Sequence, residues 1–312
     1  MEYNYKSINK EDLITLQTLH NQSFKAQHSL QYVKKKYETN NFGKAPIGFL
    51  ALDHHNFPSG YYGVFPIKIS YDNEIYIASQ SGDTMTHPDH RGKGLFMKLA
   101  QHTYERCAQE NIEFVFGFTN SQSHRGFEKL GWEFNGKWKQ LFFKTKFPSQ
   151  IKYLHKIKLF KNIINANLGK LSISGANWQV HLPKQVKGIV IKDQSFFDYK
   201  KGYSSSKVIQ YKGFNLFVKI DGELLIGDVS YFELSRMKDF IAAIQDLGNL
   251  YFCSGVRLMF SENHWLSDYA RSINLPLFEN EMEGKIGGKI FNMKSGIKLE
   301  TMMFTLGDAD FF

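Results

Sequence analysis

A short loop between two patterned segments constrains this chain more than any other stretch. Residues 75–86 combine Ile75, Ile77 and Met85 with small and hydroxyl residues, which predicts a strand. From Leu95 onward, apolar and aromatic residues recur at the spacing of an amphipathic helix. The loop between them contains two glycines, an arginine and a lysine. Because such a loop leaves backbone N–H groups unpaired at a helix N-terminus, we expect it to bind a phosphate or a pyrophosphate.

The spacing within this loop excludes two common phosphate-binding motifs. A P-loop needs Gly-x-x-x-x-Gly-Lys followed by Ser or Thr, and a dinucleotide fingerprint needs Gly-x-Gly-x-x-Gly. The loop has neither and reads Arg91-Gly92-Lys93-Gly94-Leu95-Phe96. It resembles the motif Arg/Gln-x-x-Gly-x-Gly/Ala with which the GNAT acetyltransferase family binds the pyrophosphate of acetyl-CoA. Phe96 departs from the small residue of the family and can narrow the approach to the pyrophosphate, although the turn itself is intact.

Further features follow in the order and spacing of the same family. They are Pro88, the strand at 114–118, Asn120 and the segment 127–132. The resemblance implies the GNAT acyl-CoA acyltransferase fold, which is an α/β fold of the α+β type with a mixed sheet. It also implies acetyl-CoA as acyl donor, no metal, and a cofactor site made of Thr84, Met85, Thr86, Arg91, Gly92, Lys93, Gly94, Leu95, Phe96, Asn120, Ser123 and Phe127.

The segments that precede the loop predict the early elements of that fold. Strands are expected at 3–8, 47–51 and 60–69, the last with a hinge at Pro66. One helix opens at Lys10 and carries Leu13, Leu16 and Leu19, and a second runs from Ser29 to about Tyr37. The resemblance implies that these two helices line the entrance for the acceptor.

Two positions where relatives carry catalytic side chains hold other residues here. Phe127 stands where many family members have a tyrosine that protonates the departing thiolate, and Gln80 stands where some have a glutamate base. The nearest ionisable side chain on the strand is Asp83, which we take as the candidate base, with a structural carboxylate as the alternative. Strand alternation points Asp83 away from the face of Thr84 and Thr86, so its access to the acceptor depends on local splaying or a bulge.

Acetyl transfer remains feasible without these two side chains. A backbone N–H near Met85 can polarise the thioester oxygen. A well-positioned neutral amine can then attack directly, with its proton relayed by water. His87, His90 and His124 are further candidates because an imidazole in general titrates near neutrality, but a surface or loop role is favoured for each.

The length of 312 residues suits two domains. We expect a GNAT catalytic domain that binds acetyl-CoA at residues 1–146, a basic helical connector at 147–187 and a degenerate GNAT-like domain at 188–312. The connector is predicted to form an amphipathic helix or helix pair. We expect it to pack between the domains rather than to lie on an anionic membrane surface.

The final third of the chain lacks a second phosphate loop. Residues 233–237 pass from a predicted strand to a predicted helix without a glycine. We therefore expect this domain to shape the acceptor pocket and to bind no second cofactor. The C-terminus is expected to fray, with Asp308 and Asp310 in solvent.

The formal net charge of +9 suits an anionic cofactor and an anionic acceptor. No nucleic-acid-binding signature accompanies the lysines, so nucleic acid is not an expected partner. No apolar run approaches the roughly 18 residues of a membrane span, and the start lacks a signal-peptide pattern. We expect a cytoplasmic protein in which Cys107 and Cys253 are reduced, while the oligomeric state is not predicted.

The residues and the resemblance together predict an acetyltransferase that moves an acetyl group to a primary amine of a small acceptor. An amino sugar or a nucleotide-linked sugar is preferred by resemblance to members associated with surface polysaccharides. Two alternatives stay open. One is an acyl-CoA-binding module without turnover, which Gln80 and Phe127 favour. The other is an aminoacyl or acyl transferase with another donor, such as aminoacyl-tRNA, although that class often degrades the loop that is kept here.

Overall fold

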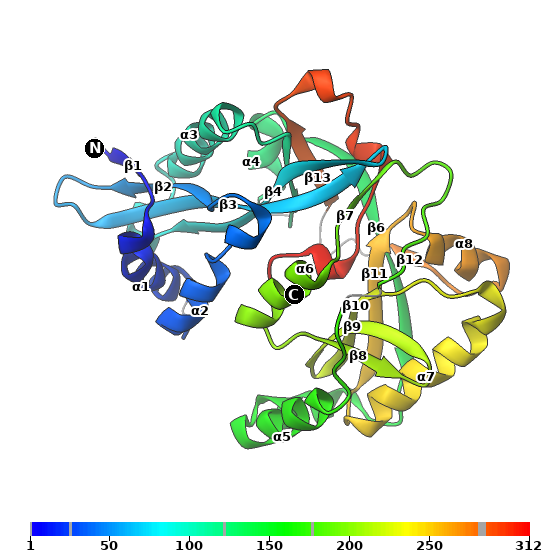
Figure 1. The fold of residues 1–312 in the computed structure, drawn as a ribbon. Coiled ribbons are helices and arrows are strands. Elements are labelled where there is room, and N and C mark those ends of the chain that lie inside the picture. Colours follow the sequence, from blue (N-terminus) through cyan, green and yellow to red (C-terminus); the bar gives the residue numbers. More distant parts are fainter. Residues whose placement is uncertain (1, 25–26, 121–122, 176–177, 280–284) are drawn as a thin grey trace. The chain divides into compact units, whose positions relative to one another are not determined.

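The computed structural model describes residues 2–24, 27–120, 123–175, 178–279 and 285–312 (Figure 1). The chain forms two compact units: Met1–Gly136 with Met282–Glu300, and Lys137–Glu281 with Thr301–Phe312. These bounds differ from the expected boundaries at 146 and 187. Strand β6 (Glu133–Lys144) runs from the first unit into the second, and β13 (Lys285–Ile290) returns to pair with β5 (Phe114–Phe118) of the first.

The first unit is built on a mixed sheet with the strand order β1-β2-β3-β4-β5-β13. Neighbouring strands pair antiparallel, except for β4 and β5, which pair parallel. This pattern is the mixed sheet that the family resemblance implies. The strands not yet bounded are β1 (Asn4–Ser7), β2 (Ile47–Leu52), β3 (Pro58–Tyr71) and β4 (Glu74–Thr86).

Helices cover both faces of this sheet. On one face lie α1 (Leu13–Phe24) and α2 (Leu30–Lys36), and on the other lie α3 (Leu95–Gln109) and α4 (His124–Lys129). The short 3-10 helices are η1 (Lys10–Asp12), η2 (Asn40–Phe42), η3 (Pro88–His90) and η6 (Met293–Ser295), while η7 (Leu299–Thr301) lies at the boundary of the units.

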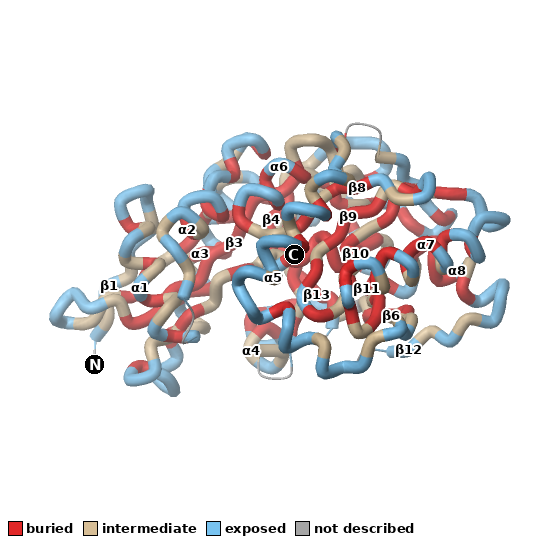
Figure 2. Tube along the Cα trace, turned by 90° about the horizontal axis from the view of Figure 1, so that it is seen from below, coloured by how far each residue is buried: buried red, intermediate tan, exposed pale blue. Residues whose placement is uncertain are grey.

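Each face of the first sheet has its own apolar cluster, and buried residues follow the central strands (Figure 2). Full burial of one large apolar side chain stabilises the fold by about 1.5–3 kcal/mol. The α1/α2 face includes Leu16, Leu19, Val33, Tyr61, Phe65 and Met85. The α3/α4 face includes Tyr62, Val64, Leu95, Leu99, Phe127 and Trp132.

The long hairpin of β3 and β4 is continuous at Pro66, so the predicted hinge there is wrong. Pro66 pairs with Ser79 and the register is unbroken on either side. The pairing of β2 with β3 ends at Val64, so the missing N–H of Pro66 costs no bond to β2. The irregularity lies instead between Tyr61 and Gly63.

The second unit repeats this strand pattern in the order β6-β11-β10-β9-β8. Only β10 and β11 pair parallel along this order. The central strands are β8 (Lys207–Tyr211), β9 (Phe214–Asp221), β10 (Glu223–Val229) and β11 (Gly255–Ser261). Short strands are β7 (Gly188–Val190), β12 (Phe278–Glu279) and β14 (Met302–Met303).

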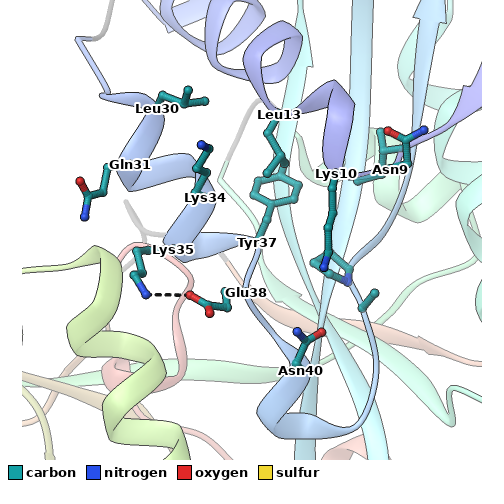
Figure 3. A pocket seen from close by; sticks show the side chains of 13 residues that line it. Asn9, Lys10, Leu13, Leu30, Gln31, Lys34, Lys35, Tyr37, Glu38 and Asn40 are labelled. Atoms are coloured by element: carbon teal, nitrogen blue, oxygen red, sulfur yellow. Dashed lines mark hydrogen bonds and ion pairs between the residues drawn. The ribbon is translucent and has the colours of Figure 1, made fainter.

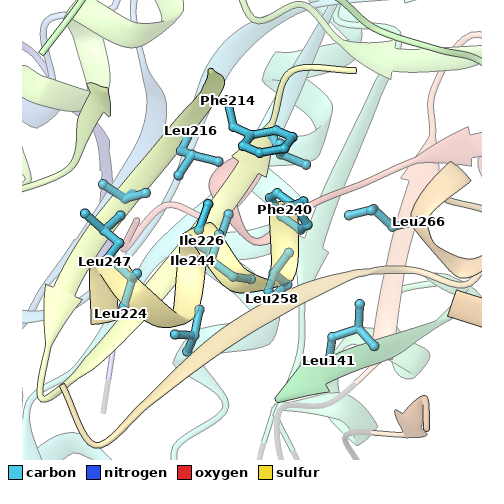
Figure 4. Close-up of a cluster of buried hydrophobic side chains, with 14 of the residues drawn as sticks. Leu141, Phe214, Leu216, Leu224, Ile226, Phe240, Ile244, Leu247, Leu258 and Leu266 are labelled. Atoms are coloured by element: carbon cyan, nitrogen blue, oxygen red, sulfur yellow. The ribbon is translucent and has the colours of Figure 1, made fainter. Parts of the chain in front are cut away.

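The described residues of the second unit also form four helices and three 3-10 helices. They are α5 (Lys158–Gly169), α6 (Gln194–Tyr203), α7 (Met237–Leu250), α8 (Trp265–Ser272), η4 (Ser149–Lys156), η5 (Leu234–Arg236) and η8 (Leu306–Asp308). Phe240, Ile244 and Leu247 recur at helical spacing on α7 and pack with Leu224 and Ile226 of β10 (Figure 4). Ile164 and Leu168 of α5 join the same cluster, so the predicted connector helix belongs to this core.

The C-terminal segment is packed into the second unit, and the expectation of solvated carboxylates is wrong for Asp308. Its side chain is fully buried and lies 2.8 Å from Nζ of Lys192, which also lies 3.0 Å from Asp228. Asp308 and Thr305 form a reciprocal capping box that starts η8. Phe312 is fully buried as well. The terminus thus supplies both apolar surface and a charge partner to the interior.

Candidate functional site

The loop before α3 has the geometry of an anion site. Gly92 and Gly94 have φ values of 75° and 74°, which L side chains rarely adopt. A Cβ placed on either glycine would meet nothing within 4 Å, so this turn is open. Gly94 precedes Leu95 as the N-cap of α3, and no side chain caps the helix there. The first N–H groups of α3 therefore lack helical acceptors and fit the oxygens of a diphosphate.

Phe96 does not obstruct this turn. Its ring packs against the rings of Phe127 and Tyr62, at centroid distances of 5.1 and 5.8 Å. A Cβ on Gly126 would lie 2.5 Å from that ring, so Gly126 makes room for it. The bulky residue at the small position of the motif is thus accommodated by α4, on the α3/α4 face.

The two basic side chains of the loop bind main-chain oxygens. Arg91 donates from Nη2 to the carbonyl of Ser23 at 3.1 Å and from Nε to that of Thr86 at 3.4 Å. Lys93 donates to the carbonyl of Asp89 at 3.0 Å. Arg91 therefore ties the end of α1 and the end of β4 to the loop, while it keeps a positive charge beside the glycines.

Strands β4 and β5 part next to this loop. Their parallel pairing covers only Ser79 with Val115 and Gln80 with Phe116, although β4 continues to Thr86 and β5 to Phe118. Beyond Gln80, this edge of β4 has backbone groups that β5 does not pair. Met85 lies in this unpaired part, so its predicted role as an N–H donor stays a prediction, and its side chain is buried in the α1/α2 face.

A bulge in β4 decides where Asp83 points. Gly82 pairs with Gly63 and Met85 with Tyr61, so that Asp83 and Thr84 together oppose one residue of β3. Asp83 takes a left-handed conformation with a φ of 40°. Of the two irregularities on which the access of Asp83 was expected to depend, splaying or a bulge, the bulge is therefore present.

The carboxylate of Asp83 is engaged by two partners on α2 and beside it. Its Oδ1 lies 2.7 Å from Nζ of Lys36, and its Oδ2 accepts a hydrogen bond from the hydroxyl of Tyr37 at 3.0 Å. Burial by itself would raise the pKa of Asp83, but Lys36 and Tyr37 outweigh it and the pKa lies below its usual value. A carboxylate held in this way is a weak base, which favours the structural alternative for Asp83.

His20 of α1 is an ionisable group that the sequence analysis missed. Burial lowers its pKa below the usual 6.5, and the charge of Asp83 partly offsets that effect. Its ring lies 4.6 Å from the ring of His28, whose pKa burial also lowers. The signal was available in the sequence, because His20 follows Leu13 and Leu16 at the spacing of the inward face of α1.

The side chain of Phe127 is buried, with only 5 % exposed. Its ring lies 4.2 Å from that of Trp132 and 6.3 Å from that of Tyr62, so this position holds core packing. Gln80 is also buried, with 4 % exposed.

Asn120 and Ser123 are brought together at the start of α4. Oδ1 of Asn120 accepts hydrogen bonds from the backbone N and from Oγ of Ser123, at 3.0 and 3.1 Å. This local turn fixes the end of β5 beside the parting of the strands. The contact of either residue with a coenzyme stays a prediction.

The three histidines considered from the sequence lie in loops or at a helix end. Asp89 N donates to Nδ1 of His87 at 3.4 Å, so that His87 caps η3. Nδ1 of His90 shares a hydrogen bond with the hydroxyl of Tyr3 at 2.9 Å. His124 lies 3.1 Å from Glu128 on α4. These contacts are those of structural side chains.

An open hollow of about 980 Å³ lies beside η1, α1, α2 and residues 37–46 (Figure 3). Three lysines and one glutamate line it: Lys10, Lys34, Lys35 and Glu38. Lys35 and Glu38 form an ion pair at 2.8 Å. Tyr37 both lines the hollow and binds Asp83, so it links the hollow to the bulge of β4.

Residues 4–135 match the family model described as an acetyltransferase (GNAT) domain. This part of the chain is a GNAT acetyltransferase domain. The match ends just after α4, and it contains the glycine loop, the bulge and the parting strands. No curated protein matches the sequence.

Solved structures share the fold of the GNAT domain and of the rest of the chain. A probable N-acyltransferase from Enterococcus faecalis has a TM-score of 0.59 at 12% identity, covering 93% of this chain and 73% of its own. A GCN5-related N-acetyltransferase from Anabaena variabilis has a TM-score of 0.59 at 14% identity, with coverages of 94% and 74%. A putative acetyltransferase from Pyrococcus horikoshii has a TM-score of 0.53 at 10% identity, with coverages of 98% and 94%. Identities this low establish the fold alone.

Outside the GNAT domain, the second unit has no glycine turn where its own parallel strands part. Pairing of β10 with β11 covers Leu224 to Ile226, and beyond it Phe260 of β11 bridges Thr305 of the C-terminal segment. A Cβ on Gly227 of β10 would lie 2.3 Å from the ring of Phe312. The C-terminal segment thus lies against both strands at this point.

Among the described residues, no group of three metal-ligating side chains is placed to hold a metal ion. No helix in the described part of the chain has both the length and the apolar character that crossing a membrane requires.

Proposed function

We propose that the GNAT domain transfers an acetyl group from acetyl-CoA to a primary amine of a small acceptor. The observation that carries this proposal is the open left-handed turn at Gly92 and Gly94, which leads into an uncapped α3 beside the parting of β4 and β5. Acetyl-CoA supplies the activated thioester. The turn and α3 hold its diphosphate with main-chain N–H groups, while Arg91 adds a positive charge.

The chain contributes position and electrostatics to the transfer. The main chain of β4 beyond Gln80 offers N–H groups to the thioester oxygen. The amine must arrive neutral. We propose His20 as an alternative to Asp83 for the removal of its proton, because Asp83 is paired with Lys36 whereas the lowered pKa of His20 keeps the imidazole neutral at pH 7.

The hollow beside α1 and α2 is the proposed acceptor side. Lys10, Lys34 and Lys35 outnumber Glu38 there, which favours an acceptor that carries an anionic group. A nucleotide-linked amino sugar has the required amine and phosphates, and it stays the preferred class. The test is calorimetric titration of acetyl-CoA, followed by assay of free-thiol release with amines that differ only in an added phosphate or carboxylate.

The expected result is coenzyme binding and faster thiol release with the anionic amines. Absence of acetyl-CoA binding contradicts the proposal as a whole. Equal rates with neutral and anionic amines contradict only the acceptor class.

A binding module without turnover is the second candidate. Phe127 and Gln80 supply no acid or base, and Asp83 is committed to an ion pair. Firm binding of acetyl-CoA with no thiol release across the amine panel supports this candidate. Titration of longer acyl-CoA esters and of aminoacyl-tRNA in parallel tests the remaining alternative of a different donor.

A further inference from the structure

A buried chain of hydrogen bonds leads from the core of the GNAT domain to the parting of β4 and β5. Nε1 of Trp132 donates to the hydroxyl of Tyr104 at 2.8 Å. The hydroxyls of Tyr104 and Tyr62 lie 3.0 Å apart, and that of Tyr62 lies 2.9 Å from Oγ of Ser81. Ser81 is the first residue of β4 past its last pair with β5.

In this series of hydrogen bonds, all buried donors find an acceptor only if donation runs in one direction. An indole N–H donates and never accepts, so Tyr104 accepts from Trp132. Within the described residues, the hydroxyl of Tyr62 has only Tyr104 and Ser81 as hydrogen-bond partners, and that of Tyr104 has only Trp132 and Tyr62. Both tyrosines are buried, with 0 % of Tyr62 and 5 % of Tyr104 exposed, so a hydroxyl hydrogen without an acceptor would be costly.

The cost of an unmatched hydrogen fixes the order of donation. If Ser81 donated to Tyr62, then either Tyr62 or Tyr104 would keep a hydrogen with no acceptor. If Tyr104 donates to Tyr62 and Tyr62 to Ser81, both buried hydrogens are used. The one hydrogen left over is that of Ser81, which is half-exposed at the parting strands.

We infer that Ser81 donates a hydrogen bond to the sulfur of the coenzyme as the thioester breaks, in place of the acid missing at Phe127. This inference rests on the proposed function. In the step, the amine nitrogen forms a bond to the acyl carbon and its proton passes to the base or to water. The bond from the acyl carbon to sulfur breaks, and its electron pair stays on sulfur. No proton leaves Ser81, and solvent later protonates the thiolate.

The acidities of the groups support donation of a hydrogen bond without proton transfer. Burial raises the pKa of both Tyr62 and Tyr104 above the usual 10.0. A thiol has a pKa of about 8.5, so the more weakly acidic hydroxyls of Tyr62 and Tyr104 do not give up a proton to a thiolate at equilibrium. The tyrosines instead stay protonated and keep the hydrogen of Ser81 directed outward.

Phe127 lies next to the same chain. Its ring contacts that of Tyr62 at a centroid distance of 6.3 Å. At the position where relatives carry a proton donor, the ring of Phe127 therefore packs against Tyr62. The hydroxyl at the parting strands comes instead from Ser81 of β4.

The test measures the pKa of the thiol of bound CoA from its thiolate absorbance, which needs no turnover. Ser81→Ala is compared with Ser81→Thr, which keeps a hydroxyl, and with Tyr62→Phe, which breaks the chain. Ser79→Ala is the matched control, since Ser79 is fully buried on the same strand and its Oγ has no hydrogen-bond partner among the described residues.

The wild-type protein is expected to lower the thiol pKa of bound CoA. Ser81→Ala should raise it by about 0.5–1 unit, the worth of one hydrogen bond, and should lower kcat more than it changes KM for acetyl-CoA. Ser81→Thr and Ser79→Ala should match the wild type, and Tyr62→Phe should fall between. Equal thiol pKa values in the wild type and Ser81→Ala, with CoA bound in both, overturn this inference alone. Absence of CoA binding by the wild type overturns the proposed function and this inference with it.

Discussion

Ser81 and Asp83 stand two residues apart on β4, yet they direct their side chains to opposite faces of the sheet. Ser81 meets Tyr62 on the α3/α4 face, and Asp83 meets Tyr37 on the α1/α2 face. Regular alternation would place both on one face. The bulge and the left-handed backbone of Asp83 reverse the order between them. This one irregularity puts a hydroxyl on the proposed coenzyme side and a charged pair on the proposed acceptor side.

The double variant Arg91→Glu with Gly94→Glu should weaken acetyl-CoA binding by about 10–100-fold, because it strains the turn and places negative charge at the N-terminus of α3. Calorimetric titration measures the effect. Gly296→Glu is the control, since Gly296 also has a positive φ of 67° and open space around it. Unchanged affinity in the double variant would count against the whole assignment of the cofactor site.

Replacement of Asp83 by Asn should lower the free energy of unfolding at pH 7 by about 3–5 kcal/mol, because it leaves Lys36 buried without its partner. The folded pKa of Asp83 is lowered, so its contribution is complete above the unfolded value of about 3.9 and is lost as pH falls through the folded value. The difference from wild type should therefore shrink in acid. Urea unfolding at neutral and acidic pH measures both, and Glu38→Gln in the exposed pair with Lys35 should change little. Turnover that is unaffected in Asp83→Asn would exclude a catalytic base at this residue.

The pH profile distinguishes His20 from Asp83 as the base. If His20 accepts the proton of the amine, the rate should rise with pH through an inflection below 6.5, because burial lowers its pKa. His20→Gln should remove the inflection and reduce kcat by about 100-fold or more. Asp83→Asn should move the inflection to lower pH, since the charge of Asp83 raises the pKa of His20. His54→Gln, on an exposed histidine, serves as control. A profile that His20→Gln leaves unchanged excludes this role.

Phe127→Ala should act on packing more than on the coenzyme. Its ring is 5 % exposed and contacts Trp132, Phe96 and Tyr62, so truncation should lower the free energy of unfolding by about 3–5 kcal/mol. Below the melting range, acetyl-CoA affinity should fall much less than in the Arg91 and Gly94 double variant. Thermal unfolding and titration of the same preparations check both parts, and a loss of binding without loss of stability would show direct contact with the coenzyme.

Lys192→Met should destabilise the second unit. It leaves the carboxylates of Asp228 and Asp308 buried together, at an expected cost of about 3–5 kcal/mol at pH 7. Burial and the nearby charge of Asp308 raise the folded pKa of Asp228, and loss of Lys192 removes the charge that opposes them. Stability should therefore fall as pH rises from acid to neutral. Chemical unfolding as a function of pH measures this trend. Lys201→Met, in a partly exposed pair with Asp198, should show no such trend.

Local features of the sequence determined much of the first unit. The spacing of apolar residues placed the strand at 75–86 and the helix from Leu95, close to the observed β4 and α3. The glycine turn at Gly92 and Gly94 was also evident, because a left-handed turn before a helix depends on a few adjacent residues. The family match over residues 4–135 agrees with the resemblance that those motifs carried.

Only the tertiary structure decided what lies opposite each side chain. The partner of Asp83 is Lys36, which is 47 residues away, and the strand beside β5 is β13, more than 160 residues later in the chain. The fate of Asp308 likewise depended on Lys192. Periodicity specifies which residues face inward, but a bulge shifts that order by one residue and is set by pairing with a distant strand. The sequence alone therefore determined the loop and the elements around it, while long-range packing decided which charges are paired and which hydroxyl reaches the parting strands.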